Sequence, residues 1–282
     1  MKKKLSLVFS VLLLIAGILI FFYPAISNYV NVYRQYNVVS HYVASSAQIV
    51  PEDKEQYLQE AREYNERLLE YGSVEQAITE VQKDSEEYAS ILNYNQDGVM
   101  GTVEIPDLNI YLPIYHGTEK EILKEGAGHY EGSSFPVGGA GTHAVITGHR
   151  GLPSADLFTK LDEMEEGDLF FIHVFDETYC YQTDGIQVVE PEEIDSLSIV
   201  PGEDRVTLVT CTPYGVNSHR LLIHGIRIPY EEEPEQERID VDEKLEQYRL
   251  VKQMCVGVAI LAAVLLTVFL FRKAGKRKGK NK

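Results

Sequence analysis

Two long apolar runs without charged residues lie near the two ends of the chain. The first, 5–23, reads LSLVFSVLLLIAGILIFFY, and the second, 253–271, reads QMCVGVAILAAVLLTVFLF. A membrane-spanning helix needs about 20 apolar residues, and short basic flanks stay in the cytoplasm. Because each run is basic at its outer end, the pattern predicts two spans with the region between them outside. For the first run, a signal peptide cleaved near Ala25-Ile26-Ser27 is the alternative.

Residues 51–92 show the periodicity of helices. Apolar side chains recur at i, i+4, i+7 and i+11 and therefore share one helical face: Tyr57, Ala61, Tyr64 and Leu68. Pro51 suits a helix start, and Gly72 with Ser73 divides the stretch into two helices. Most other positions are Glu, Gln, Lys or Arg. We interpret this stretch in part as a spacer that carries the main body away from a membrane.

From Gly98 onward, β-branched and aromatic runs alternate with Gly, Pro and Asp turns, which indicates strands. Short helical pieces fit near 118–124 and 154–161. Many short strands joined by tight turns predict a closed barrel or a sandwich. Eight strands are predicted: 99–105, 109–114, 143–148, 168–175, 178–183, 185–190, 205–211 and 220–228.

Charge is distributed unevenly along the 282 residues, which carry a net charge of −17. The extreme ends, 1–4 and 272–282, hold basic residues and no acidic ones, so all 43 acidic side chains lie between them. A strongly acidic body disfavours a nucleic-acid partner. Residues 230–248 are acidic and poor in apolar side chains, which predicts a solvated linker or an exposed helix.

Three cysteines are too few for a disulfide scaffold. Cys255 lies inside the second apolar run, and Cys180 lies in the middle of a predicted strand, where it suits packing. Cys211 ends the run TLVT and precedes a Pro/Gly turn, a place where a side chain is presented to substrate. A disulfide between Cys180 and Cys211 is the structural alternative, and it requires close Cα atoms.

A cysteine nucleophile reacts as the thiolate, which a nearby histidine or arginine favours. His149 follows an apolar strand and precedes a Gly/Pro turn, the same context as Cys211. Arg220 opens the strand after the Cys211 turn, so a hairpin would return it beside the thiol. In isolation it reads as a surface arginine. His173 and His224, in mid-strand, read as satisfied surface or core residues.

Nothing in the sequence indicates a metal or a cofactor. No two histidines have HxxxH spacing, the cysteines do not cluster, and no glycine-rich loop with a lysine is present to hold phosphate. The loop Gly138-Gly139-Ala140-Gly141 lacks the strand–helix frame of a nucleotide site.

Several blocks together resemble the sortases. Thr207-Leu208-Val209-Thr210-Cys211 matches the TLxTC signature of that family, Arg220 follows at the family's spacing, and Thr147-Gly148-His149 matches the histidine block. The stretches GVMGTVEIP, LPIYHGT, GAGHYEGSSFPVGG, TGHRGLPSADLFTKLD and TLVTCTPYGVNSHRLLIHG are similar to the pilin-polymerising class C. The resemblance covers roughly residues 50–230.

The resemblance implies a mainly β fold: an eight-stranded sortase-type barrel with an N-terminal helical region, flanked by N- and C-terminal transmembrane helices. It implies cysteine transpeptidation of an LPxTG-like sorting signal. By position, Cys211 would be the nucleophile, His149 the general acid and base, and Arg220 the group that orients substrate and stabilises the oxyanion. No metal or cofactor is implied. A catalytic Cys211 also disfavours its disulfide with Cys180.

One motif departs from the class C pattern. Members of that class usually carry an Asp-Pro-aromatic lid before the barrel, in the active site. Asn93, Tyr94 and Asn95 stand at that place here, without the aspartate and proline. The resemblance therefore implies, at most, an altered lid with Tyr94 as its plug.

The implied function is joining an LPxTG-like signal to a lysine amine of another pilin subunit. The alternatives are anchoring surface proteins to a peptidoglycan precursor, a protease that releases surface proteins, or a non-catalytic scaffold barrel tethered to a membrane. The expected location is the cell membrane, with two spans and an extracellular catalytic domain. The expected divisions are a basic end and anchor (1–34), a helical spacer with the lid (35–97), the barrel (98–230), an acidic linker (231–252), the second span (253–271) and a basic tail (272–282).

Overall fold

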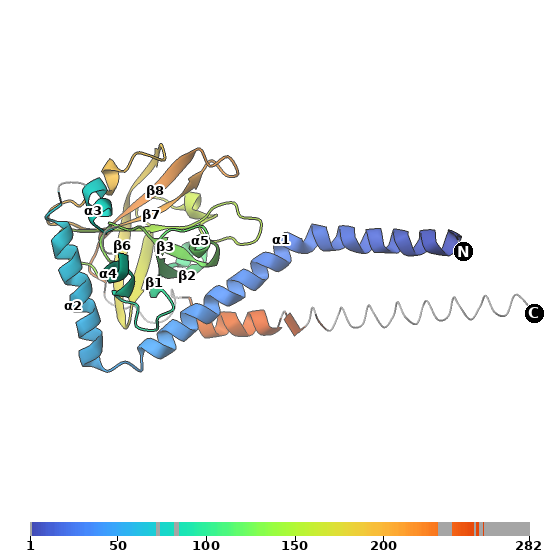
Figure 1. Cartoon of the computed structure of the whole chain (residues 1–282), viewed down its shortest axis with the longest axis horizontal. Helices are drawn as coiled ribbons and strands as arrows, with labels where there is room; N and C mark the ends of the chain where they lie inside the picture. The colour runs from blue at the N-terminus through green and yellow to red at the C-terminus, as the bar shows by residue number, and fades with distance from the viewer. Residues whose placement is uncertain are drawn as a thin grey trace, which may run out of the picture. The chain divides into compact units, whose positions relative to one another are not determined.

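The computed structural model describes residues 2–71, 74–81, 85–230, 239–250, 252–253 and 256. The chain separates into two units, residues 1–239 and residues 240–282. In the second unit, residues 241–250 form a helix. The first unit contains the barrel and the helices that precede it, and Figure 1 labels these elements in chain order.

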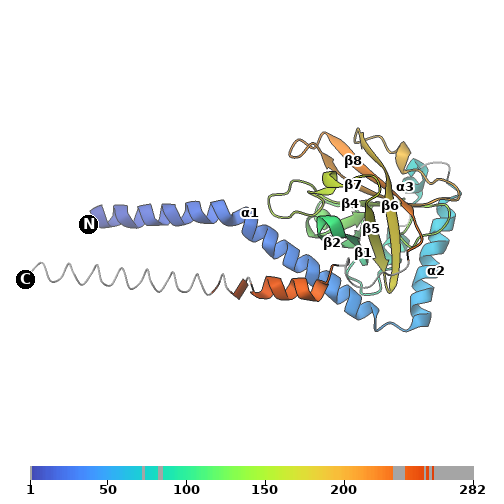
Figure 2. The same ribbon diagram turned by 180° about the vertical axis from the view of Figure 1, so that it is seen from behind.

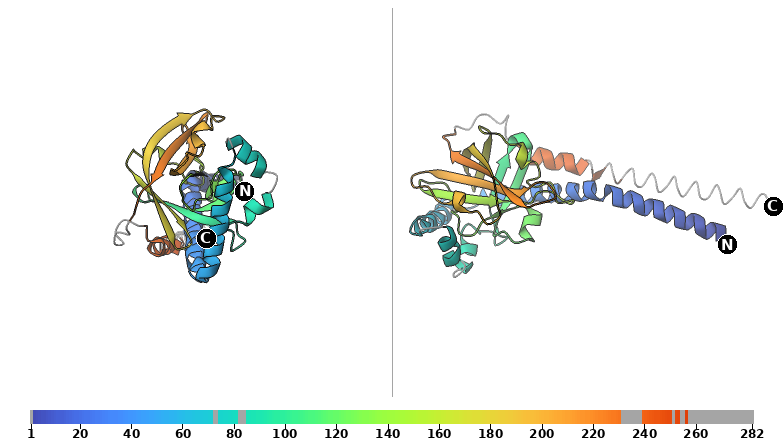
Figure 3. Two further views of the ribbon diagram at one scale, coloured as in Figure 1. Left: turned by 90° about the vertical axis from the view of Figure 1, so that its left-hand side faces the viewer. Right: turned by 90° about the horizontal axis from the view of Figure 1, so that it is seen from above.

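Strands of the first unit close into a barrel in the order β1-β2-β3-β4-β7-β8-β6-β5, which confirms the predicted eight-stranded barrel. Figure 3 shows the strands curving around a common interior. The pairs β2–β3 and β4–β7 are parallel, and the other neighbours are antiparallel. The strands are β1 (Val99–Ile105), β2 (Ile110–His116), β3 (Ala127–His129), β4 (Thr142–Thr147), β5 (Leu169–Val174), β6 (Glu177–Val189), β7 (Asp204–Thr212) and β8 (His219–Arg227).

The number of strands agrees with the prediction because two errors offset each other. The short strand β3 is absent from the prediction. The predicted strands 178–183 and 185–190 are one strand, β6, whose register shifts between Thr183 and Gly185. A β-bulge of this kind bends a strand without ending it. The remaining strands agree within one or two residues.

Within the described residues, three helices lie between the long N-terminal helix and the barrel: α2 (Pro51–Leu68), α3 (Val74–Val81) and α4 (Ser85–Ser90). The apolar face of α2 is buried in the same core as the barrel interior, through Leu58, Ala61, Tyr64 and Leu68. Asn65 on this helix donates to the carbonyl oxygen of Phe135 at 3.0 Å and accepts from the Phe135 amide at 2.7 Å. The stretch expected to be a spacer is therefore docked on the barrel, and α2 runs along one side of it in Figures 1 and 2.

Helix α1 (Lys2–Ser46) contacts β1 and β2 through its C-terminal part. The buried Tyr42 hydroxyl donates to the carbonyl of Met100 at 3.1 Å and accepts from the amide of Phe175 at 3.0 Å. One side chain thus fastens α1 to two separate parts of the barrel. Burial without such partners would leave a costly unsatisfied hydroxyl.

Of the two helical pieces predicted inside the barrel region, one is shorter than expected and the other is not a helix. The piece near 118–124 is a single helical turn, α5 (Ile122–Glu125). The piece near 154–161 is a series of turns that ends in the 3-10 turn η3 (Leu161–Glu163). Two further 3-10 turns are η2 (Pro106–Leu108) and η4 (Asp195–Leu197).

The membrane prediction is not upheld. Within the part of the chain that the structure describes, no helix combines the length and the apolar character that a membrane span requires. This finding overturns the predicted cell-membrane location with two spans. The side chains of residues 5–19, other than 13 and 17, and nearly all of 253–282 lie outside the described residues, as do residues 231–238 of the acidic linker.

Candidate active site

Cys211 and Arg220 are brought together by the β7–β8 hairpin. The register pairs them directly opposite each other, so the hairpin returns Arg220 beside the thiol. Directly opposed residues of an antiparallel pair project from the same face with their Cβ atoms roughly 5 Å apart. Both residues are half-buried. The guanidinium Nη1 of Arg220 donates to the carbonyl oxygens of His219 at 3.2 Å and Asn217 at 3.4 Å, on the chain that connects the two strands.

His149 reaches the same place from β4. The parallel β4–β7 ladder ends at Thr147 opposite Val209, and the attachment continues one residue further. The Gly148 amide donates to the Val209 carbonyl at 3.0 Å, and the Thr210 hydroxyl donates to the Gly148 carbonyl at 2.7 Å. The residue before His149 is thereby bonded to the residue before Cys211.

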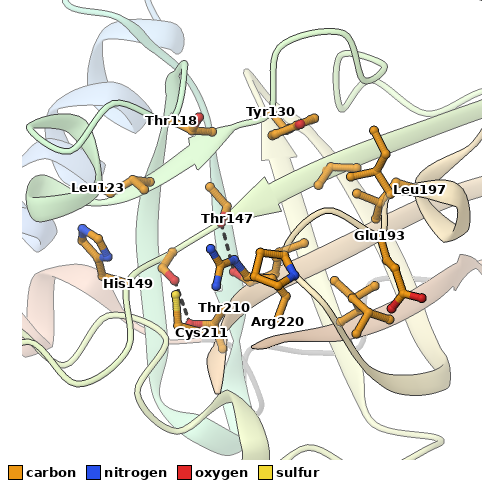
Figure 4. Close-up of a pocket in the computed structure, with 17 residues that line it drawn as sticks. Thr118, Leu123, Tyr130, Thr147, His149, Glu193, Leu197, Thr210, Cys211 and Arg220 are labelled. Atoms are coloured by element: carbon orange, nitrogen blue, oxygen red, sulfur yellow. Dashed lines mark hydrogen bonds between the residues drawn. The ribbon is translucent and has the colours of Figure 1, made fainter. Parts of the chain in front are cut away.

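One cavity of about 290 Å³ contains all three predicted catalytic residues. In Figure 4, Cys211 lies between His149 and Arg220, and Glu193 and Leu197 lie on the side of Arg220 away from His149. Apolar side chains from β4, β7, β8 and the β6–β7 connection make much of the lining. The lining residues are Thr118, Leu123, Tyr130, Val145, Thr147, Gly148, His149, Val189, Pro191, Glu193, Ile194, Leu197, Val209, Thr210, Cys211, Arg220 and Leu222.

Burial and two nearby cations favour the neutral form of the His149 imidazole. Partial burial lowers its pKa below the ordinary value, and repulsion from Lys120 and Lys124 lowers it further. A histidine shifted in this direction is mostly neutral near neutral pH, so a ring nitrogen is available to accept a proton, and the imidazolium gives that proton up readily. The site thus combines a thiol, an imidazole poised as base and a fixed guanidinium.

The two cysteines of the barrel are both free, so the alternative disulfide between Cys180 and Cys211 is not formed. Cys180 is fully buried on β6, and burial raises the pKa of its thiol to about 11. Cys211 is partly accessible in the cavity. Of the two, only Cys211 is placed to react.

Three other barrel histidines, His143, His173 and His224, belong to buried polar networks. The imidazole of His173 is hydrogen-bonded to the carboxylate of Glu104 at 2.9 Å. The Thr207 hydroxyl links His143 and His224, at 2.7 and 2.8 Å. The interpretation of His173 as a satisfied residue is confirmed, because both of its ring nitrogens have partners. His224 is buried and bonded through Nδ1 to Thr207, but its Nε2 has no hydrogen-bond partner among the residues that the structure describes. Within the described residues, no group of three His, Cys, Asp or Glu side chains is arranged to hold a metal ion.

Asn93, Tyr94 and Asn95 do not form a lid over the cavity, because none of them lines it. The Tyr94 hydroxyl is bonded to the Ser45 hydroxyl at 2.7 Å and donates to the Tyr42 carbonyl at 3.0 Å. Its ring packs on Tyr42 and Phe175. Asn93 accepts from the Gly98 amide, and Asn95 donates to Ser45. Without the aspartate and proline of the usual motif, this segment binds α1 instead of the active site.

Sequence reasoning missed several cavity residues. The wall from Val189 to Leu197 comes from the β6–β7 connection, whose side chains follow no periodic pattern. The cations Lys120 and Lys124, which act on His149, come from the segment around α5. Their positions depend on how loops fold over the barrel end, and no local motif in the sequence marks them.

Comparisons with known proteins point to one family. A sortase domain model matches residues 103–228. The crystal structure of sortase C1 from Streptococcus agalactiae is 41% identical, with a TM-score of 0.66, over 69% of this chain and 100% of that chain. Sortase C from Streptococcus pneumoniae is 42% identical, with a TM-score of 0.62, over 70% of this chain and 99% of that one. Sortase D of Bacillus subtilis is 28% identical over 45% of this chain and 63% of its own length.

Proposed function

The chain belongs to the sortase family of cysteine transpeptidases, and we propose that it assembles pilin subunits. In this proposal it cleaves an LPxTG-like sorting signal between Thr and Gly and transfers the threonyl group to a lysine amine of another pilin subunit. The observation that carries the proposal is the convergence of Cys211, His149 and Arg220 on one cavity. An extended peptide fits a cavity with apolar walls and polar groups gathered at one end.

Acylation begins with attack of the Cys211 thiolate on the threonine carbonyl carbon. Negative charge moves to the carbonyl oxygen, where the guanidinium of Arg220 stabilises it. Protonated His149 then gives its proton to the glycine amine as the C–N bond breaks. The products of this half-reaction are a thioester on Cys211, neutral His149 and a peptide that begins with glycine.

Transfer reverses these roles. A neutral lysine amine attacks the thioester carbonyl, His149 accepts the amine proton, and Cys211 leaves as the thiolate. An isopeptide bond forms, and the thiolate–imidazolium pair is restored. The lowered pKa keeps the His149 imidazole in the neutral form that can accept the amine proton, and it makes the imidazolium a stronger acid in the acylation step. Because water competes with the amine for the thioester, the apolar walls of the cavity favour transfer over hydrolysis.

The choice of a pilin acceptor rests on the likeness to sortase C. Those structures match this chain at 41% and 42% identity over essentially their whole length, and the pneumococcal sortase C structure provides insights into pilin substrate specificity. The curated sortases A and D match at lower identity or over shorter spans, for example 31% over 52% of sortase A from Streptococcus agalactiae. Anchoring to peptidoglycan uses the same acylation chemistry and differs only in the acceptor amine.

The test incubates the full-length protein with an LPxTG peptide, with and without a lysine-containing pilin fragment. Mass spectrometry follows the acyl adduct on Cys211 and the isopeptide product. Both should appear with wild-type protein and disappear in Cys211→Ala. The matched control is Cys180→Ala, which removes a thiol that is buried away from the cavity and should leave both products in place.

The result distinguishes the competing functions. Acyl adduct with transfer only to a peptidoglycan-type amine would replace pilin assembly by wall anchoring. Release of the free acid in the presence of either amine would indicate a protease. Turnover that survives in Cys211→Ala would reject the proposed mechanism altogether.

A further inference from the structure

The residues next to His149 in the chain are hydrogen-bonded to the residues next to Cys211. On one flank, the Thr210 hydroxyl donates to the Gly148 carbonyl at 2.7 Å. On the other, Nη1 of Arg150 donates to the Thr212 hydroxyl at 3.2 Å. The catalytic histidine and cysteine are therefore bracketed before and after by hydrogen bonds between their immediate neighbours.

Arg150 is built into the protein and does not point into the cavity. Its side chain is only 8% exposed, and it is not among the residues that line the site. The Nη2 group is paired with the carboxylate of Asp162 in η3, and the guanidinium lies 6.0 Å from the ring centre of Tyr214. Thr212 is the last residue of β7. The Arg150 side chain therefore connects the histidine loop, η3 and the strand that carries Cys211.

The histidine loop needs a further connection to the strand of Cys211, because the backbone pairing between β4 and β7 ends before His149. The β4–β7 ladder stops at Thr147, and residues 148–160 are turns and irregular chain. The next attachments within this loop are local, such as the Phe158 amide to the His149 carbonyl at 3.1 Å. They shape the loop but do not tie it to the strand that carries Cys211. Beyond Thr210, the bond from Arg150 to Thr212 supplies that link.

We propose that Arg150 is a positioning residue: by bridging Thr212 and Asp162, it holds His149 at the distance and angle from Cys211 that proton transfer requires. The inference rests on the proposed transpeptidase function. A planar guanidinium with several fixed donors can bind a hydroxyl and a carboxylate at once, whereas a lysine ammonium on a flexible stem cannot reproduce that geometry. Misplacing a catalytic group by about 1 Å costs roughly 100-fold in rate.

The sharpest variant is Thr212→Val, which keeps the β-branched shape and removes only the hydroxyl that Arg150 binds. Thr212→Ser is its matched control because it keeps that hydroxyl. Arg150→Lys tests the bridge from the other side. Arg205→Lys is the control for loss of an arginine ion pair, since Arg205 binds Asp184 and Glu203 and does not line the cavity.

Three readouts are combined on the full-length protein. The first is kcat and KM for peptide transfer, where Thr212→Val and Arg150→Lys should lower kcat about tenfold or more and leave KM nearly unchanged. The second is the high-pH plateau rate of Cys211 alkylation, which reports access to the thiolate and should not change. The third is hydrogen exchange of amides 149–152, which should speed up in both variants. Thr212→Ser and Arg205→Lys should match wild type in all three.

Several results would overturn the proposal. Equal loss of kcat in Thr212→Ser and Thr212→Val would assign the effect to packing instead of to the hydroxyl. Wild-type transfer in Arg150→Lys and Thr212→Val, while Cys211→Ala is inactive, would reject positioning and keep the proposed function. If no protein turns over peptide, the proposed function fails, and unchanged exchange at 149–152 would reject the positioning claim separately.

Discussion

Cys211 and Arg220 are directly opposite each other in the β7–β8 pair, and the Arg220 guanidinium is held by the carbonyls of His219 and Asn217. Strand register fixes the distance between the two backbones, and the carbonyls fix the direction of the side chain. A cation held in this way stabilises a developing oxyanion without reorganising during the reaction.

Arg220→Lys should therefore be nearly as damaging as Arg220→Ala. The ammonium keeps the charge but not the planar donors that reach both the loop carbonyls and the substrate. Loss of one oxyanion donor costs about 100- to 1,000-fold in acylation rate, measured as burst formation of the thioester. The matched control is Arg227→Lys at the other end of the same strand, where the guanidinium lies 4.7 Å from the Tyr179 ring centre. Comparable losses at both positions would indicate damage to β8 instead of to the oxyanion site.

Neutralising the cations near His149 should move the pH profile of acylation. Lys120 and Lys124 add to burial in lowering the His149 pKa, so Lys120→Met with Lys124→Met should raise it. The acidic limb of the rate profile then moves to higher pH. If the reactive form is the thiolate–imidazolium pair, the plateau rate also rises, because more enzyme carries the proton on His149.

The measurement is the acylation rate from pH 5 to 10 at constant ionic strength. Lys54→Met serves as the control, since Lys54 pairs with Asp176 at 2.9 Å and does not act on His149. A downward shift of the acidic limb in the double variant would contradict the assignment of that limb to His149.

Removing Tyr94 should loosen α1 without opening the active site. Its ring packs on Tyr42 and Phe175, so Tyr94→Ala should lower the free energy of unfolding by about 2–4 kcal/mol. Tyr94→Phe keeps the ring and loses the hydroxyl bonds to Ser45 and Tyr42, for about 1 kcal/mol. Thermal unfolding measures both. Alkylation of Cys211 should proceed at the wild-type rate in each, and a marked acceleration would restore the lid interpretation.

Helix α1 also holds the tip of the histidine loop. The Asn28 side chain accepts from the Asp156 amide at 2.8 Å, and Asn31 donates to the Ser154 carbonyl at 2.6 Å. Asn28→Ala with Asn31→Ala should increase hydrogen exchange across 150–159, because the Asp156 amide loses its acceptor. Asn37→Ala is the control on the same helix, since its amide bonds only to Tyr33 one turn away. Unchanged exchange in the double variant would show that α1 does not restrain the loop.

The strands in which apolar and polar residues alternate, or in which apolar residues run continuously, were predictable, because burial in the barrel interior imposes these patterns. Strand β3 was not, since Ala127–His129 is three residues long and contains a glycine. The interruption at Asp184-Gly185 resembles a turn in sequence, and only cross-strand pairing shows that it is a bulge in β6. The predicted helix at 154–161 is not formed, and its backbone bonds instead to Asn28 and Asn31, which lie more than 100 residues earlier in the sequence.

The residues of the candidate site also fall into those that the sequence predicts and those that it does not. The gathering of His149, Cys211 and Arg220 in one cavity was predictable, because strand-end motifs and family spacing mark each residue. Arg150 reads as an ordinary neighbour of His149 until its partners are known, and Thr212 is 62 residues away. The lid was misplaced because sequence position alone assigned it, whereas the side chains of Tyr94 and Asn95 bind α1.

The parallel β4–β7 pair also determines when the reactive centre can exist during folding. Thr147 and Val209 are 62 positions apart, so their pairing closes a long loop and must overcome its closure entropy, whereas the β5–β6 and β7–β8 hairpins need only local closure. A partly unfolded chain can therefore form the Cys211 hairpin before His149 packs beside it. Cys211 and His149 come together only when the barrel closes. The complete reactive centre is therefore a property of the folded protein.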